Sequence, residues 1–304
     1  MKTLIFTFMK GLAMGAADVV PGVSGGTIAF ITGIYERLLK AIRSIGLGTL
    51  KKLQKEGIAA AWQSIDGSFL VALFGGIFVS ILSLAKALEW TMEQYPQLLW
   101  AFFFGLIVAS AIYVGKQIKS WSVPTIISLV IGIVVAYSIT LLSPAEPNVT
   151  YLMIFVSGAI AVCAMILPGI SGGFILLLMG MYAPVLGAVS DLNITFLAIL
   201  VAGCVVGLLS FSHLLSWMFD KYRDLTLALL TGFMIGALNK VWPWQNVVET
   251  RVDSHGETVP FILKSVLPGQ FDGEPYTLFA ILLTAAGFSI VFLLERTREK
   301  NPEA

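Results

Sequence analysis

The sequence predicts an all-α polytopic membrane protein made of two inverted repeats, each a re-entrant helical hairpin followed by three transmembrane helices. Of its 304 residues, 57% are hydrophobic and only 12% are charged, and the mean hydropathy is +0.89. Soluble domains carry about 25% charged residues, so this composition argues for a membrane protein. Two further observations specify the architecture: a series of long apolar segments, and a Pro-Gly-x-Ser-Gly-Gly sequence that occurs twice.

Six uninterrupted apolar segments approach or exceed the roughly 20 residues that a helix needs to cross the hydrocarbon core. They are residues 68–90, 98–114, 123–142, 194–218, 225–241 and 276–294. Each is expected to be a transmembrane helix, because helices satisfy all their backbone hydrogen bonds within one segment.

Two other apolar stretches, residues 4–35 and 151–189, are interrupted by Pro21-Gly22 and Pro168-Gly169. Proline and glycine end helices, so each stretch is predicted to form a hairpin. The arms of the first hairpin are short for a crossing at about 1.5 Å per residue, so it is expected to be re-entrant. The arms of the second are longer, and a full crossing and return stays open.

The hairpins belong to an internal repeat. A shift of 147 residues superposes residues 11–35 on 158–182 with ten of 25 positions identical, and a shift of 127 aligns 68–114 with 195–241. The first repeat is residues 1–142, with the hairpin 4–35 and a basic cytoplasmic loop 36–67 that is read as a solvated linker. The second repeat is residues 151–304, with the hairpin 151–189 and an external loop 242–274, which is polar and expected to have no fold of its own.

Three crossings per repeat make the second copy enter the bilayer from the opposite face, which is typical of inverted-repeat transporters. A cytoplasmic N-terminus places fourteen Lys and Arg residues in cytoplasmic segments and three in external ones. This asymmetry follows the positive-inside rule. Both termini are therefore predicted to be cytoplasmic.

The helix breaks are the predicted ligand site, because non-helical backbone at membrane depth persists only where it lines a cavity or is buried in protein. A new half-helix begins after each break, and its free amide N–H groups and positive dipole end favour an oxyanion such as phosphate. The predicted phosphate-binding residues are Ser24, Gly25, Gly26, Thr27, Ser171, Gly172 and Gly173, at the breaks formed by Pro21, Gly22, Pro168 and Gly169.

Two half-helix ends supply about one positive charge, which is less than the roughly 1.5 to 2 negative charges of a phosphate monoester. A cationic side chain or a proton has to supply the rest. The candidates are Lys10, Arg37, Lys86 and His213, and the last two occupy equivalent positions of the repeats. For each of them, placement at a helix end with the charge reaching the interface is the alternative interpretation.

Asp18 lies three residues before Pro21, where the bilayer is expected to be deep. An acidic residue at membrane depth is costly and indicates function. Three roles stay open for it: a proton carrier, a partner of Lys10, and a cap for the broken helix. Glu36 is a weaker candidate for charge coupling, because it adjoins Arg37 at the inner boundary, where an interfacial anchor also explains it.

Several classes of function are disfavoured. The net charge is +1, and the chain lacks the interleaved basic and aromatic tracts of nucleic-acid binders. Two histidines and two cysteines within apolar runs are too few for a metal site. No cofactor is expected, and the sequence leaves the oligomeric state open, a homo-oligomer included.

The sequences ADVVPGVSGGT at residues 17–27, GIYE at 33–36 and ILPGISGG at 166–173 resemble the polyprenyl-phosphate transporter family. The resemblance covers nearly the whole chain. It implies a bacterial inner-membrane protein, not an enzyme, that returns undecaprenyl phosphate from the outer to the cytoplasmic leaflet, where this lipid carrier serves cell-wall synthesis again. The implied partners are a polyprenyl-phosphate lipid and the surrounding membrane lipids.

Other functions fit the helix breaks as well. A membrane polyprenyl-diphosphate phosphatase also has inverted repeats and a Pro-Gly-x-Ser element, but here Gly-Gly follows each serine, and no paired glutamates or histidine adjoin either break. A transporter of small anions could use the same helix ends. A purely structural scaffold is disfavoured, because duplicated breaks are costly in lipid without a ligand.

Overall fold

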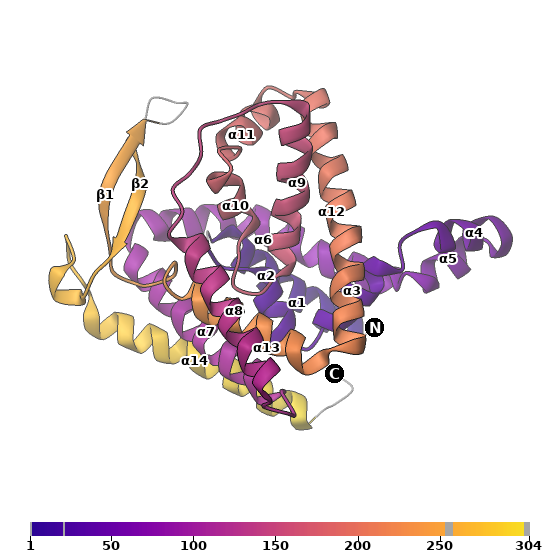
Figure 1. The fold of residues 1–304 in the computed structure, drawn as a ribbon, viewed down its shortest axis with the longest axis horizontal. Helices are drawn as coiled ribbons and strands as arrows, with labels where there is room; N and C mark the ends of the chain where they lie inside the picture. Colours follow the sequence, from indigo (N-terminus) through magenta and orange to yellow (C-terminus); the bar gives the residue numbers. More distant parts are fainter. Residues whose placement is uncertain (1, 21, 253–257, 301–304) are drawn as a thin grey trace.

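The computed structural model describes residues 2–20, 22–252 and 258–300. The first half contains α1 (Lys2–Val19), α2 (Gly25–Ile31), α3 (Tyr35–Arg43), α4 (Leu47–Glu56), α5 (Ile58–Ser64), α6 (Gly67–Gln94), α7 (Pro96–Lys116) and α8 (Val123–Thr140). The second half contains α9 (Tyr151–Ile166), α10 (Gly172–Leu178), α11 (Tyr182–Ser190), α12 (Ile194–Lys221), α13 (Arg223–Ala237), β1 (Gln245–Val252), β2 (Thr258–Ser265), the 3-10 turn η1 (Pro268–Gln270) and α14 (Thr277–Lys300). Figure 1 shows their arrangement.

Five helices of the described chain are long and apolar enough to cross a membrane. They are α6, α7, α8, α12 and α14, and they confirm that the protein is a multi-pass membrane protein. The helices α6 and α12 each have 28 residues. At 1.5 Å per residue such a helix is about 42 Å long, which exceeds a hydrocarbon core of about 30 Å, so each of these helices extends beyond the core or tilts within it.

The crossing predicted at residues 225–241 is shorter than expected. Helix α13 has 15 residues and ends at Ala237, which gives it a length of about 22 Å. Beyond it the chain turns, and the side-chain amide of Gln245 donates to the carbonyls of Lys240 at 2.9 Å and Trp242 at 3.0 Å. These bonds hold a turn where the hydropathy of the segment predicts further helix.

Each hairpin contains a second bend that the sequence did not predict. Helix α2 is separated from α3, and α10 from α11, and the axes of the second pair differ by 107°. The bends contain Gly33 with φ +73° and Gly180 with φ +68°. Glycine adopts this left-handed conformation without a steric penalty, so both copies of the repeat turn at the same glycine.

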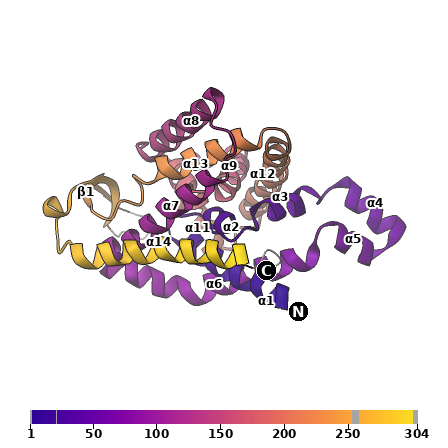
Figure 2. The ribbon, with the colours of Figure 1, turned by 90° about the horizontal axis from the view of Figure 1, so that it is seen from below.

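Two segments predicted as loops have regular structure. Residues 36–67 form α3 to α5, and α4 and α5 project together from the body of the molecule (Figures 1 and 2). Residues 242–274 contain the antiparallel hairpin β1–β2. The prediction that this external segment lacks a fold was wrong, and so was the all-α assignment there. Valine and other β-branched residues in 245–265 favour strands over coil.

The long helices pack through glycines. Gly76 of α6 lies against the backbone carbonyl of Phe8 in α1, and Gly203 of α12 lies against that of Phe155 in α9. The third helix of each half packs on the second helix of the other half, α14 on α7 and α8 on α13. Small residues let membrane helices approach closely, so the glycine contacts join helices within each half. The packing of α14 on α7 and of α8 on α13 holds the two halves together.

Candidate functional site

The two helix breaks lie directly against each other. The hydroxyl of Ser24 lies 2.9 Å from the carbonyl oxygen of Leu167, to which it donates. The amide of Gly169 donates to the hydroxyl of Thr27 at 3.1 Å. Gly22 with φ +85° and Gly169 with φ +88° form the turns, in a conformation that favours glycine. Pro168 is buried in its turn, whereas Pro21 lies outside the described residues.

The first break is closed by its own side chains. The Gly25 amide donates to Asp18 Oδ1 at 2.7 Å, and the Gly26 amide donates to Ser24 Oγ at 3.0 Å. The Thr27 amide donates to the carbonyl of Ser24 at 3.0 Å. All three amides at the start of α2 therefore have acceptors, and the Asp18 carboxylate lies where an anion would otherwise bind.

The second break differs at one decisive position. Met165 is the repeat equivalent of Asp18, and its side chain lies against Gly172 just as Asp18 lies against Gly25. In the described part of the chain, the amides of Gly172 and Gly173 and the hydroxyl of Ser171 have no hydrogen-bond partner. The start of α10 therefore keeps free donors for a ligand.

Lys240 is a cation that borders both breaks. Its side chain packs against Gly22, where an added Cβ would lie 2.9 Å from Lys240 Cγ. Its ammonium lies 4.5 Å from the ring centre of Phe174 in α10. Among the described residues it has no carboxylate partner. A half-buried lysine without a counter-ion favours binding of an anion.

The turn that carries Lys240 is held from two directions. The side-chain amide of Gln245 donates to the carbonyls of Lys240 and Trp242 in the turn. The side-chain amide of Asn239 donates to Thr140 Oγ1, at the end of α8, at 3.0 Å. These contacts link the turn to β1 and α8, so the lysine is presented from a fixed backbone rather than from a free loop.

A cavity of about 580 Å³ opens beside this turn, between the end of α8, α10 and the hairpin β1–β2. Its polar lining includes Lys240, Lys264 and Ser265, and its apolar lining includes Leu141, Phe174 and Leu178. A small recess bordered by Gly22, Gly169, Ser171 and Lys240 extends it to the breaks. A cavity lined by two cations and by leucines suits an amphipathic anion.

The charged candidates from the sequence lie elsewhere. Glu36 forms an ion pair with Arg223 at 2.7 Å, and Arg37 forms one with Asp66 at 2.6 Å. Lys86 and His213 are exposed on α6 and α12, and Lys10 is half-buried on α1. None of them lines the cavity. Of the three roles considered for Asp18, capping has a direct contact, and Asp18 forms no ion pair within the described residues.

Sequence reasoning missed Lys240. The charge count placed this lysine among the three external Lys and Arg residues, because it lies at the outer end of an apolar segment. The available signal was its place within the predicted crossing 225–241, where a cation is as costly as Asp18 is in the first hairpin.

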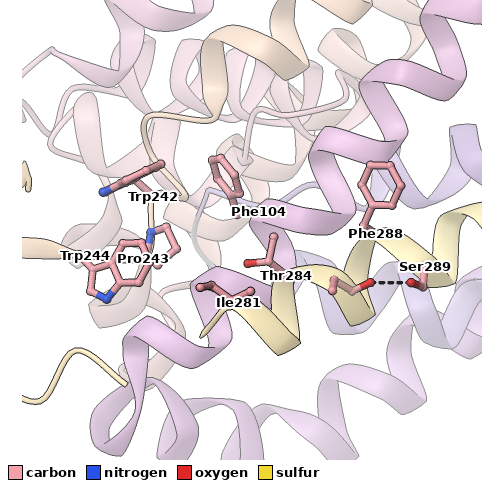
Figure 3. A pocket seen from close by; sticks show the side chains of 9 residues that line it. Phe104, Trp242, Pro243, Trp244, Ile281, Thr284, Phe288 and Ser289 are labelled. Atoms are coloured by element: carbon pink, nitrogen blue, oxygen red, sulfur yellow. Dashed lines mark hydrogen bonds between the residues drawn. The ribbon is translucent and has the colours of Figure 1, made fainter. Parts of the chain in front are cut away.

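A second pocket, of about 430 Å³, lies between α7, α14 and residues 242–244. Figure 3 shows Trp242, Trp244, Phe104 and Phe288 around it. Within the described chain its lining contains no charged side chain. It therefore offers contacts to apolar chains but nothing for a headgroup.

The fold is that of a multi-pass membrane protein, and its candidate site combines two apposed helix breaks with a lysine that has no ion pair among the described residues. Comparison with known proteins specifies the class. Residues 14–259 match the model of the undecaprenyl phosphate translocase-like family, and the chain belongs to that family.

The relatives carry corresponding names. The chain is 51% identical over 298 residues to a polyprenyl-phosphate transporter of Vibrio cholerae serotype O1, covering 97% of each chain. It is 32% identical over 253 residues to a polyprenyl-phosphate transporter of Staphylococcus aureus, covering 77% of this chain and 85% of that relative. These matches confirm the resemblance and the assignment to transporters rather than enzymes. No solved structure matches the chain significantly.

Proposed function

We propose that this protein moves polyprenyl phosphate across the bacterial inner membrane, from the outer to the cytoplasmic leaflet. The observation that carries the proposal is the position of Lys240, a cation without an ion pair among the described residues, beside the open helix break and in a cavity with both polar and apolar lining. The family supports this cargo, since its relatives are named polyprenyl-phosphate transporters.

The phosphate binds at the second break. The Lys240 ammonium, the Ser171 hydroxyl and the amides of Gly172 and Gly173 are its donors, and Lys264 adds a second positive charge at the cavity rim. Two lysines balance the roughly 1.5 to 2 negative charges of the headgroup. Helix α10 has only seven residues, so its dipole adds less than the lysines do.

The first break supports the site from behind. Ser24, Gly25, Gly26 and Thr27 are buried and bond to Asp18 and to the second break. In this conformation they hold the second break in place, and they would meet the phosphate only after a rearrangement. The polyprenyl chain extends from the headgroup over the leucines of the cavity into lipid.

The two halves form inverted repeats in this proposal. The repeat-related contacts of Gly76 with Phe8 and of Gly203 with Phe155 support a common fold for the halves. The ends of α6, α12 and α14 that carry the excess of Lys and Arg face the cytoplasm, and so do both termini. In Figure 1 the N-terminus and the end of α14 lie far from the hairpin β1–β2, which is then external.

Inward movement of an anion opposes an inside-negative potential by about 2.3 kcal/mol per charge per 100 mV. Co-transport of protons would offset this cost, with the headgroup or Asp18 as the carrier. Asp18 adjoins the first break, so a change in its protonation would change the cap of α2.

The test is a leaflet-resolved flux assay in proteoliposomes that contain the purified protein and a polyprenyl phosphate. The proposal predicts protein-dependent movement of the lipid from one leaflet to the other, without release of inorganic phosphate. Phosphate release would identify a phosphatase. Flux of chloride or free phosphate with no flux of the lipid would identify a transporter of small anions.

A further inference from the structure

The two hairpins are packed very differently, although they are copies of one sequence repeat. In the first hairpin all seven residues of α2 are buried, and five residues of α3 are buried. In the second, three residues of α10 are buried, and in α11 only Ala188 is. Equivalent elements therefore occupy two environments in the same molecule.

The difference lies in what each hairpin contacts in the other half. Helix α3 packs on α12 (Figure 1), with the Tyr35 ring 6.0 Å from the Phe219 ring. The repeat equivalents of α3 and α12 are α11 and α6. These two do not pack together in the described chain. Helix α2 also contacts α7 and α14, whereas α10 meets α8 and α13 less extensively, through a small cluster that contains Ile175, Ile139 and Phe233.

Among the described residues, the hairpin helix α3 forms ion pairs with the other half of the chain, whereas α11 forms none. Glu36 of α3 pairs with Arg223 at 2.7 Å, and Arg43 of α3 pairs with Asp220 at 3.2 Å. Their repeat equivalents are Ala183 with Pro96 and Ser190 with Glu93, which form no such pairs. The two ion pairs form a latch at one end of the molecule, and the other end has no counterpart of it.

The cavity with Lys240 opens beside the loosely packed hairpin. Resting on the proposed function and its orientation, we infer that the structure is the outward-facing state of the transporter, held by the latch of Glu36–Arg223 and Arg43–Asp220. In the inward-facing state the hairpins exchange roles: α11 packs on α6 and closes the Lys240 cavity, while α3 separates from α12. Inverted repeats permit this exchange, because each half can adopt the conformation of the other.

Disulfide crosslinking in the full chain tests the exchange. Met92→Cys and Tyr182→Cys, in a background with Cys163→Ala and Cys204→Ala, report on the contact between α6 and α11, because these positions are the repeat equivalents of Phe219 and Tyr35. A disulfide requires Cα atoms within about 7 Å. The protein with the unmodified latch should give little crosslink. The double variant Arg43→Gln with Arg223→Gln should raise the crosslinked fraction about three- to tenfold, because it removes the stabilisation that two exposed ion pairs give to the outward-facing state.

A second readout and two matched variants keep the result interpretable. Labelling of Ser143→Cys in the cavity by an impermeant thiol reagent should fall in the latch variant. Lys116→Gln removes another ion pair, with Glu295 of α14, that involves neither hairpin; it should leave both readouts unchanged. The charge swap Glu36→Arg with Arg223→Glu re-forms the ion pair in reverse, so it should give as little crosslink as the protein with the unmodified latch.

Unchanged crosslinking and labelling in the latch variant would overturn the inference, and so would an equal response to Lys116→Gln. Both readouts are taken without polyprenyl phosphate, so they do not depend on the cargo. Exchange of the hairpins without lipid flux would refute the proposed cargo and support the exchange. Lipid flux without exchange of the hairpins would support the proposed cargo and refute the exchange.

Discussion

Replacement of Lys240 by glutamine should weaken the binding of polyprenyl phosphate about tenfold to 150-fold. A charge pair about 4 Å apart at an effective dielectric constant of about 20 is worth about 4 kcal/mol. Desolvation of the half-buried ammonium offsets part of this, and a hydrogen bond to a charged group nets about 1.5 to 3 kcal/mol. At 1.4 kcal/mol per factor of ten, the loss corresponds to the range given.

The thermal stability of Lys240→Gln should stay close to that of the wild type, because in the described chain Lys240 has no ion pair and its amine lies over the Phe174 ring. The assay is a titration of the protein in nanodiscs with a short-chain polyprenyl phosphate, followed by microscale thermophoresis. Lys86→Gln, on the exposed surface of α6, is the matched control and should bind normally. Binding by Lys240→Gln within twofold of wild type would refute the assignment.

Substitutions at three further positions test the surroundings of the site. Gly22→Ala places a Cβ 2.9 Å from Lys240 Cγ at φ +85°, so it should cost about 1 to 2 kcal/mol in thermal unfolding and weaken lipid binding; binding as tight as wild type would contradict the contact. Asp18→Ala removes the cap of α2 and should lower the free energy of unfolding by about 1 kcal/mol. Asp18→Asn keeps a hydrogen-bond acceptor and should keep the stability of the wild type. If lipid flux by Asp18→Asn also responded normally to a pH gradient, Asp18 would not be the proton carrier. Gln245→Ala frees the carbonyls of the Lys240 turn and should weaken lipid binding several-fold with the lysine present; an unchanged dissociation constant would show that the turn needs no support.

The part of the fold that could be predicted from the sequence is the part that lies within the lipid bilayer. Long apolar segments become helices because no other structure satisfies their backbone in a bilayer, and the predicted crossings 68–90, 98–114, 123–142, 194–218 and 276–294 correspond to α6, α7, α8, α12 and α14. The repeated Pro-Gly marks both helix breaks for the same reason. Outside the bilayer this constraint is lost, and the strands β1 and β2 and the helices α4 and α5 were missed.

The candidate site was likewise predictable only in part. The sequence predicted Ser171, Gly172 and Gly173, but the position of the cation Lys240 depends on where helix α13 ends and the chain turns. Lys240 reaches the breaks because α13 stops at Ala237 and Gln245 folds the next residues back. That turn depends on contacts between residues 140, 239 and 245, which hydropathy cannot reveal. The role of Asp18 likewise required a distance, 2.7 Å to the Gly25 amide.

A cryo-electron microscopy map of the protein in nanodiscs with bound polyprenyl phosphate would locate the headgroup. Density for the phosphate is expected within hydrogen-bonding distance of Lys240 Nζ and of the amides of Gly172 and Gly173. Headgroup density at the far end of the bundle, beside Lys119, Lys221 and Arg223, with the recess at Lys240 empty, would contradict this expectation.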